Sequence, residues 1–236
     1  LPGGVSGQDS TRGNPFPQAA IGEYKVITSN YKAEYDQLGS AAITAVTRSG
    51  SNEFGGSFFW DRTSTDWRKA SEAEAAAGEK AEFREEQYGA SFEGPIVRDR
   101  LHFFVTYEAK EYVSPRAVVP GQGYAGTPGL LPAALQPLLG TWSAPFKQDM
   151  YFGKLSWQPG DAHLVEFTAK VREESELGNF DGTRTRPYGS EKDNDDRRFD
   201  LRHQYSGERV LNDLHLTYED ASWRPRAATI APGYVL

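Results

Sequence analysis

The chain contains no cysteine, and its acidic residues outnumber its basic ones. The absence of cysteine from all 236 residues excludes a disulfide scaffold, a thiolate zinc site and a cysteine nucleophile. The 33 acidic and 26 basic residues give a net charge of −7, which argues against a nucleic-acid partner. No apolar run approaches the ~18–20 residues that a membrane-spanning helix requires.

Motifs for catalysis, cofactors and metals are also missing from the sequence. There is no G-x-S-x-G elbow, no P-loop, and no G-x-G-x-x-G that follows a strand. No pair of carboxylates stands out for acid–base chemistry. The histidines are far apart and lack the spacing of a metal site. We therefore expect no enzymatic activity, no cofactor, and no metal at the four histidines, which are His102, His163, His203 and His215.

One run of carboxylates could in principle hold calcium. Residues 191–196 read EKDNDD, but they lack the D-x-[DN]-x-[DN]-G spacing of a calcium loop. The run predicts a solvated loop, and calcium binding by this loop stays open.

The residues that are present favour a folded chain with many turns. Hydrophobic residues make up 38% and aromatic residues 13% of the chain, with 24 Gly and 14 Pro. The mean hydropathy of −0.64 is typical of a soluble protein. A transmembrane β-barrel gives the same average, because lipid-facing and lumen-facing residues alternate. The chain begins at Leu1, so we expect a piece of a longer protein whose export signal lies upstream.

Strand-like segments dominate the chain from residue 54 onward. After a loop-like start over residues 1–20, two short strands are expected at 21–29 and 41–48. Seven longer segments follow, and each has about 10–12 residues, close to the ~9–11 of a tilted membrane-spanning strand. The mean strand of globular domains is only ~5–6 residues long. The seven segments are 54–63, 86–96, 101–112, 148–157, 163–172, 197–206 and 214–223.

Side chains alternate between two faces in the last three segments. Phe167, Leu201 and Leu216 belong to a face that is almost entirely apolar or aromatic, whereas the opposite face carries only polar residues. A soluble β-sandwich with one packed face alternates in the same way, and alternation alone favours it.

The connectors between the segments alternate in length. Three are tight, at 97–100, 158–162 and 207–213, and three are long, at roughly 64–85, 113–147 and 173–196. A short connector always follows a long one, which is typical of an outer-membrane barrel, and a compact soluble domain seldom has three such long connections. Within the long connectors we expect a helix over 67–80 and a short helix or turn over 130–140.

Several motifs follow one another in the order found in a known family. They are IGEYKVITSN (21–30), VTRSGSNEFGGSFF (46–59), QYG (87–89), GPI (94–96), RDR (98–100) with the Phe103–Phe104 pair, and YE (107–108). On this set, the chain resembles the TonB-dependent outer-membrane receptors, in particular the Oar-like subgroup. Gly55 and Glu93 depart from that pattern, because the family often has His and Gly there.

The resemblance implies a plug domain inside a barrel of 22 strands. Residues 1–52 would be the C-terminal part of the plug, and residues 53–236 the N-terminal part of the barrel. The expected fold is all-β, an antiparallel up-and-down meander of about seven strands of an incomplete transmembrane barrel in the outer membrane. The implied partners are outer-membrane lipid, an unknown solute, and the TonB complex, reached through a segment upstream of this chain.

The polar face would then surround the path of the solute. The residues that we predict to line the lumen are Glu166, Lys170, Arg172, Arg198, Asp200, Arg202 and Glu219. Their charges could pair across strands, line the path, or do both. Two alternatives to a TonB-dependent active transporter remain at this point: a passive outer-membrane porin or adhesin barrel, and a soluble β-sandwich that binds carbohydrate or protein.

Overall fold

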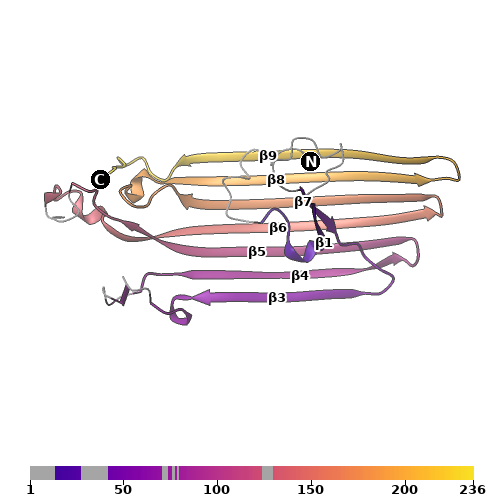
Figure 1. Ribbon diagram of the computed structural model, residues 1–236, viewed down its shortest axis with the longest axis horizontal. Helices are drawn as coiled ribbons and strands as arrows, with labels where there is room; N and C mark the ends of the chain where they lie inside the picture. The colour runs from indigo at the N-terminus through magenta and orange to yellow at the C-terminus, as the bar shows by residue number, and fades with distance from the viewer. Residues whose placement is uncertain (1–13, 28–41, 71–73, 76–77, 79, 124–129) are drawn as a thin grey trace.

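Seven antiparallel strands form one sheet in the order in which they occur along the chain (Figure 1). The computed structural model describes residues 14–27, 42–70, 74, 75, 78, 80–123 and 130–236. All seven strands predicted from the sequence are confirmed. Their bounds are β3 Gly55–Ser64, β4 Arg84–Val97, β5 Leu101–Val118, β6 Gly140–Gly160, β7 His163–Gly178, β8 Ser190–Ser206 and β9 Leu211–Ala227. β3 and β9 form the two edges, and no ladder joins them in the described part of the chain.

Four of the strands extend well beyond the predicted ends on the side of the long connectors. β5 and β6 remain paired as far as Val118 and Gly140, even though Pro115 and Pro145 lie in this region and obscure the strand pattern in the sequence. The long connectors therefore shrink to 65–83, 119–139 and 179–189.

The acidic run 191–196 lies in β8, so its prediction as a solvated loop is wrong. Basic residues on β9 compensate its charge: Arg226 pairs with Glu191 at 2.9 Å and with Asp193 at 2.5 Å, and Arg224 pairs with Asp195. Opposite charges across a ladder stabilise strand pairing, which the sequence of a single segment does not reveal.

The connectors alternate as predicted. The short turns 98–100, 161–162 and 207–210 lie at one end of the sheet, and the long connectors lie at the other end, on the left of Figure 1. The predicted helix over 67–80 is described only in part: 65–67 form a 3-10 turn (η3, Thr65–Trp67), and 74 and 75 are helical. A 3-10 turn (η5, Gln136–Leu138) confirms the short helix or turn predicted over 130–140.

The two faces of the sheet differ in the sense predicted from alternation. Phe167, Leu201 and Leu216 lie side by side across β7, β8 and β9, and the side chains of Phe167 and Leu216 are 41% and 56% exposed. On the opposite face, Lys170 and Arg172 are only 4% and 1% exposed. We call these the apolar face and the polar face. Exposed apolar and covered polar side chains reverse the arrangement of a soluble protein, and no second large sheet packs on the apolar face in the described residues, so the sandwich alternative is wrong.

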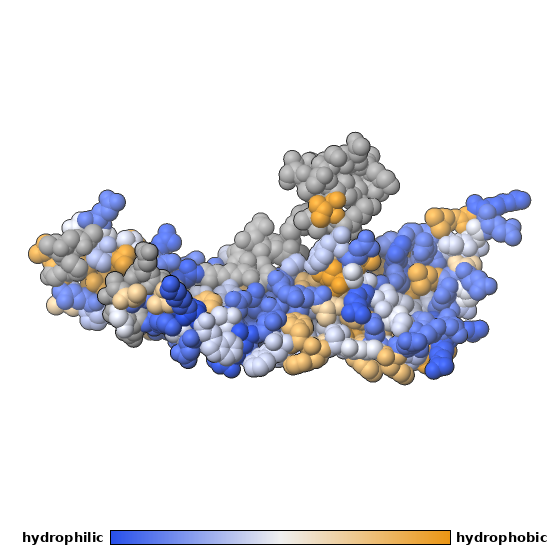
Figure 2. Space-filling model, turned by 60° about the horizontal axis from the view of Figure 1, so that its bottom comes forward, coloured by the Kyte–Doolittle hydropathy of each residue, from blue (hydrophilic) through white to orange (hydrophobic). Residues whose placement is uncertain are grey.

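A small two-stranded sheet lies on the polar face. β1 (Ile21–Ile27) pairs antiparallel with β2 (Ala42–Thr47), and the 3-10 turn η2 (Gln18–Ala20) precedes it. Ala20 packs with Phe104 and Phe152, two of the apolar side chains on the polar face, and Phe16 covers this cluster. In Figure 2 apolar residues line the lower side of the right half of the sheet.

Among the residues that the model describes, no helix has the length and apolar character needed to cross a membrane.

Candidate functional site

The polar face brings the seven predicted lumen residues together. They lie on three adjacent strands, with Glu166 opposite Arg202 and Lys170 opposite Arg198 across β7 and β8. Arg198 is in turn opposite Glu219 on β9. Neighbours on the same strand are two or four residues apart, so every one of the seven points to the same side.

Ion pairs connect these residues into a network. Glu166 lies 2.7 Å from the Lys154 Nζ and 3.5 Å from the Arg202 guanidinium. Arg202 also donates hydrogen bonds to both carboxylate oxygens of Asp213. Each charge of this row has an opposite charge next to it on a neighbouring strand, so the row is compensated within the sheet.

A second row of the network is formed around Arg198. Its guanidinium donates to Asp200 at 2.9 Å and lies 3.7 Å from Glu219. The Asp200 carboxylate also accepts a hydrogen bond of 2.6 Å from the hydroxyl of Thr217. The cross-strand pairing predicted for these charged residues is present between Arg198 and Glu219.

The most deeply covered part of the polar face surrounds Asp196. The Lys170 Nζ lies 2.6 Å from the Asp196 carboxylate, which is 0% exposed. Arg172, directly opposite Asp196, donates a long hydrogen bond of 3.4 Å to Asn194. Burial makes an unpaired charge costly, and the Asp196 carboxylate supplies the counter-charge of Lys170. The sequence reasoning missed Asp196 and Asn194, because it placed them in a loop; their alternation with Arg198 was the signal.

Residues 14–18, at the start of the described N-terminal segment, contact the same face through polar interactions with β5 and β6. The Asn14 backbone N–H donates to the Gln148 side chain at 3.1 Å, and the Gln148 amide donates back to the Asn14 carbonyl at 3.1 Å. The Gln18 backbone N–H donates to the Glu108 carboxylate at 2.6 Å. The Lys170 Nζ lies 4.7 Å from the centre of the Phe16 ring.

A row of aromatic side chains crosses the apolar face. The Trp60 indole donates to Glu86 at 2.9 Å, and the Tyr107 hydroxyl donates to Asp149 at 2.6 Å. Tyr107 packs against Tyr151 with the two rings tilted and their centres 5.0 Å apart. Aromatic rings with a polar tip are typical of the membrane–water interface. The sequence reasoning did not identify this girdle, although the aromatic residues share one parity along their strands.

An apolar stretch of β6 separates Tyr151 from the next outward aromatic side chain, Trp157. Tyr151 and Trp157 lie six residues apart on β6, which is ~20 Å at about 3.3 Å per residue. Between them lie only small or apolar outward side chains, Gly153 and Leu155. The apolar band of outer-membrane barrels is ~25 Å tall.

Comparison with known proteins agrees with this geometry. Residues 46–122 match the family model described as an outer membrane beta barrel domain. The matched residues include β3–β5, and the unclosed antiparallel meander of β3–β9 has the fold of an incomplete transmembrane β-barrel. Over 112 residues, 44% of the chain, the sequence is 32% identical to the TonB-dependent transporter Oar of Myxococcus xanthus. The chain spans 11% of the length of that relative. The resemblance of this barrel segment to the Oar-like TonB-dependent receptors is confirmed, and so is its place in the outer membrane.

The histidines of the barrel segment divide between the two faces. His163 and His203 stack on the apolar face, with ring nitrogens 3.0 Å apart, near the short turns. His102 and His215 lie on the polar face, where His102 bonds to Asn52. Within the described ranges, no three His, Asp or Glu residues come together in a group that could hold a metal ion.

The first long connector of the barrel segment has its own polar centre. Arg68 donates to both carboxylate oxygens of Glu74 and to the Ala81 carbonyl at 2.8 Å. The hydrogen bond from Arg68 to Glu74 raises the pKa of this guanidinium, which therefore stays charged at every physiological pH. The contact ties the two ends of the connector together.

Proposed function

We propose that this chain is part of a TonB-dependent active transporter that takes up a solute across the outer membrane. In this proposal, β3–β9 form part of the barrel wall and residues 1–52 form the end of a plug. The polar face lines the solute path, with Glu166, Lys170, Arg172, Arg198, Asp200, Arg202 and Glu219 as lining residues. The TonB complex acts on a segment upstream of this chain.

The proposal is carried by a difference between the interactions within the wall and those that hold the N-terminal segment to the wall. The ion pairs of the polar face, such as Glu166 with Lys154 and Arg198 with Asp200, join wall residues to one another. The described part of residues 1–52 is held to the wall by hydrogen bonds to Gln148 and Glu108 and, at its end, by the ion pair of Arg48 with Glu93. Because each such hydrogen bond contributes only ~0.5–1.5 kcal/mol net when both groups can return to water, residues 14–18 can move away and leave the ion pairs among wall residues intact.

The name of the relative supports an energised mechanism. The Myxococcus xanthus protein is called a TonB-dependent transporter, and a wall with a separate segment seated on its polar face fits such a mechanism. A passive porin needs no movable segment in its lumen. The solute itself is not specified by the residues of the polar face, which combine both charge signs.

A cross-link between segment and wall tests the proposal. The full-length protein would carry Asn14→Cys together with Gln148→Cys, and a short bifunctional methanethiosulfonate would join the two thiols in cells. We expect a lower cross-linking yield in energised cells that contain TonB than in cells that lack TonB or are treated with a protonophore, because TonB draws the segment away from the wall.

A matched pair within the wall serves as the control. Ser57 and Ser91 face each other across β3 and β4, with hydroxyl oxygens 2.7 Å apart, so Ser57→Cys with Ser91→Cys should cross-link equally in all three kinds of cells. An equal yield for the Asn14–Gln148 pair in all cells would contradict the proposal. Steady conductance of the full-length protein in planar bilayers would favour the porin alternative.

A further inference from the structure

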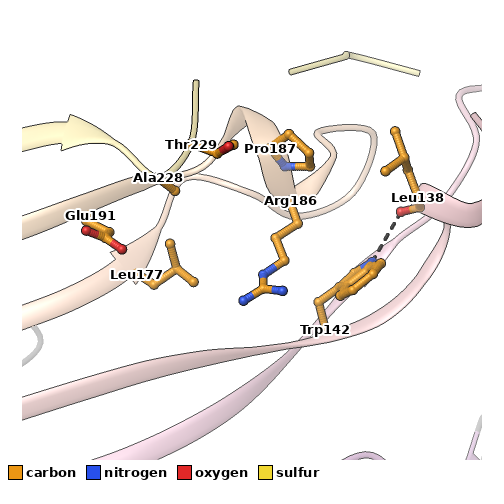
Figure 3. Close-up of a pocket in the computed structure, with 8 residues that line it drawn as sticks. All are labelled: Leu138, Trp142, Leu177, Arg186, Pro187, Glu191, Ala228 and Thr229. Carbon is orange, nitrogen blue, oxygen red and sulfur yellow. Dashed lines mark hydrogen bonds between the residues drawn. The ribbon is translucent and has the colours of Figure 1, made fainter. Parts of the chain in front are cut away.

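A cavity opens where the two halves of the sheet separate at the long-connector rim. The β6–β7 ladder ends at the pair Phe146–Glu176, whereas β6 continues to Gly140 beside β5. The cavity between the separated strands has a volume of about 370 Å³ (Figure 3). Its lining comes from four different parts of the chain: Leu138, Trp142, Leu177, Arg186, Pro187, Glu191, Ala228 and Thr229.

Most of the lining is apolar, and its geometry is fixed. The Trp142 indole N–H donates to the Leu138 carbonyl at 3.2 Å, which holds the ring in place. Trp142 and Leu177 also pack on a buried cluster that contains Val118 and Phe180. A cavity of this size with a rigid aromatic wall can bury a ligand of a few hundred Å³.

The charges of the cavity leave one cation without a partner. Figure 3 shows the Arg186 side chain reaching into the space between Leu177 and Trp142. Its guanidinium lies 5.6 Å from the Trp142 ring centre, and in the described part of the structure it has no hydrogen bond or ion pair. Glu191 does not compensate it, because Glu191 is paired with Arg226 at 2.9 Å.

We infer that this cavity binds a small amphipathic monocarboxylate, with the carboxylate on Arg186 and an apolar or aromatic group against Trp142 and Leu177. A guanidinium stacked on an indole presents its free N–H groups in a fork that matches a carboxylate. A single cation suits a monoanion, and the apolar lining favours a ligand with an apolar body. The inference rests on the proposed function for the later transport of the ligand, but binding itself can be measured separately.

Calorimetry on the purified full-length protein tests the inference with two probes. N-acetyl-phenylalanine carries the carboxylate, and N-acetyl-phenylalaninamide has the same shape without the charge. We expect the acid to bind about tenfold more tightly than the amide, since a hydrogen bond to a charged group contributes on the order of such a factor. Arg186→Gln should abolish this difference and leave the affinity for the amide unchanged.

Two further variants separate the cavity from its surroundings. Arg184 is a neighbouring arginine that stacks on Tyr188 at 5.5 Å and does not line the cavity, so Arg184→Gln should keep the tenfold preference. Trp142→Leu should weaken the binding of both probes, because it removes the ring on which the guanidinium and the ligand rest.

Three outcomes would overturn the inference: equal affinity for acid and amide, a preference that survives Arg186→Gln, or no binding of either probe to the unchanged protein. The proposed function fails separately, if the cross-linking yield of the Asn14–Gln148 pair does not depend on TonB. Binding without TonB-dependent movement would leave the cavity as a ligand site of a different kind of barrel.

Discussion

Asp196 shows how much one residue of the polar face contributes. It lies beside Lys170 and directly opposite Arg172, and all three side chains are almost completely covered. Removing one partner of a buried ion pair is strongly destabilising, because the other charge remains in a poorly solvated place. Lys170 therefore depends on the Asp196 carboxylate as its counter-ion.

Asp196→Asn should lower the free energy of unfolding by about 3–5 kcal/mol. Lys170→Met should lower the free energy of unfolding less in the Asp196→Asn variant than in the unchanged protein, because the lysine of that variant has already lost its counter-ion. Urea unfolding of the full-length protein in lipid vesicles measures both effects. The exposed pair of Arg224 with Asp195 is the control, and Arg224→Gln should cost less than about 1 kcal/mol. Equal losses of unfolding free energy for Asp196→Asn and Arg224→Gln would contradict a stabilising buried pair of Lys170 and Asp196.

Neighbouring residues on β7 give a direct test of the two faces. Phe167 points into the apolar band and Thr168 to the polar face. Phe167→Lys should destabilise the barrel by about 2–4 kcal/mol, the cost of a lysine on the lipid face near the middle of the bilayer. Thr168→Lys should cost clearly less, since its side chain stays on the side of water. Unfolding in vesicles of the same lipid measures the difference, and a reversed order would place the lipid on the other face.

At the level of elements, the junction between β2 and β3 is fixed to the first short turn. The Asn52 side-chain N–H donates to the Asp99 carboxylate at 2.6 Å, and the Asn52 side-chain oxygen Oδ1 accepts from the Asp99 backbone N–H at 2.7 Å. Arg48 pairs with Glu93 at 3.2 Å. Gly50 passes so close to β5 that a Cβ atom there would lie 2.1 Å from the Phe103 carbonyl oxygen.

Gly50→Ala should therefore loosen this junction. The Phe103 backbone is held by ladders on both sides, so the junction has to move, and overpacking of this kind costs about 1–3 kcal/mol. Limited proteolysis of the folded full-length protein should show cleavage near residue 50 about tenfold faster, with the wall intact. Gly160→Ala is the control, because nothing lies within 4 Å of its new Cβ. An unchanged cleavage rate for Gly50→Ala would show that the junction has room.

The sequence predicted the existence and faces of the strands but not their length. Strict alternation around Phe167 and Leu201 is a local pattern, and a strand repeats it in every pair of residues. The extension of β6 to Gly140 depends on its partner β5. There the apolar side chains Trp142, Ala144 and Phe146 share the parity of the polar face, so the pattern of the apolar band does not continue. Pro145 adds to this, because proline usually indicates the end of a strand.

The candidate site was predictable in its residue types and only partly in its contacts. Parity alone placed Glu166 and Arg202 on the same face, and the structure pairs them. The cavity around Arg186 and Trp142 was not predicted, because it joins segments that are more than 40 residues apart and requires the split between β6 and β7. No pattern within a single segment of the sequence indicates where β6 and β7 separate.

On the scale of the whole molecule, the strands are longer than the membrane is thick. The apolar band ends at the aromatic girdle around Tyr107 and Tyr151, and β6 continues from there to Gly140. Outward side chains in this continuation are charged or polar, as at Lys147 and Asp149. The sheet therefore consists of a membrane zone next to the short turns and a water-exposed zone next to the long connectors.

This division fixes the orientation of the chain in the membrane. In outer-membrane barrels the short turns face the periplasm and the long loops face the outside. Lys69 is exposed in the first long connector and Asp161 in a short turn. In the full-length protein, a large polyethylene-glycol maleimide should label Lys69→Cys on intact cells. Asp161→Cys should be labelled only after the outer membrane is permeabilised, because the reagent cannot cross it. Labelling of both cysteines on intact cells would contradict a membrane between the two rims of the sheet. Labelling of Asp161→Cys alone on intact cells would reverse the orientation and place the cavity around Arg186 in the periplasm.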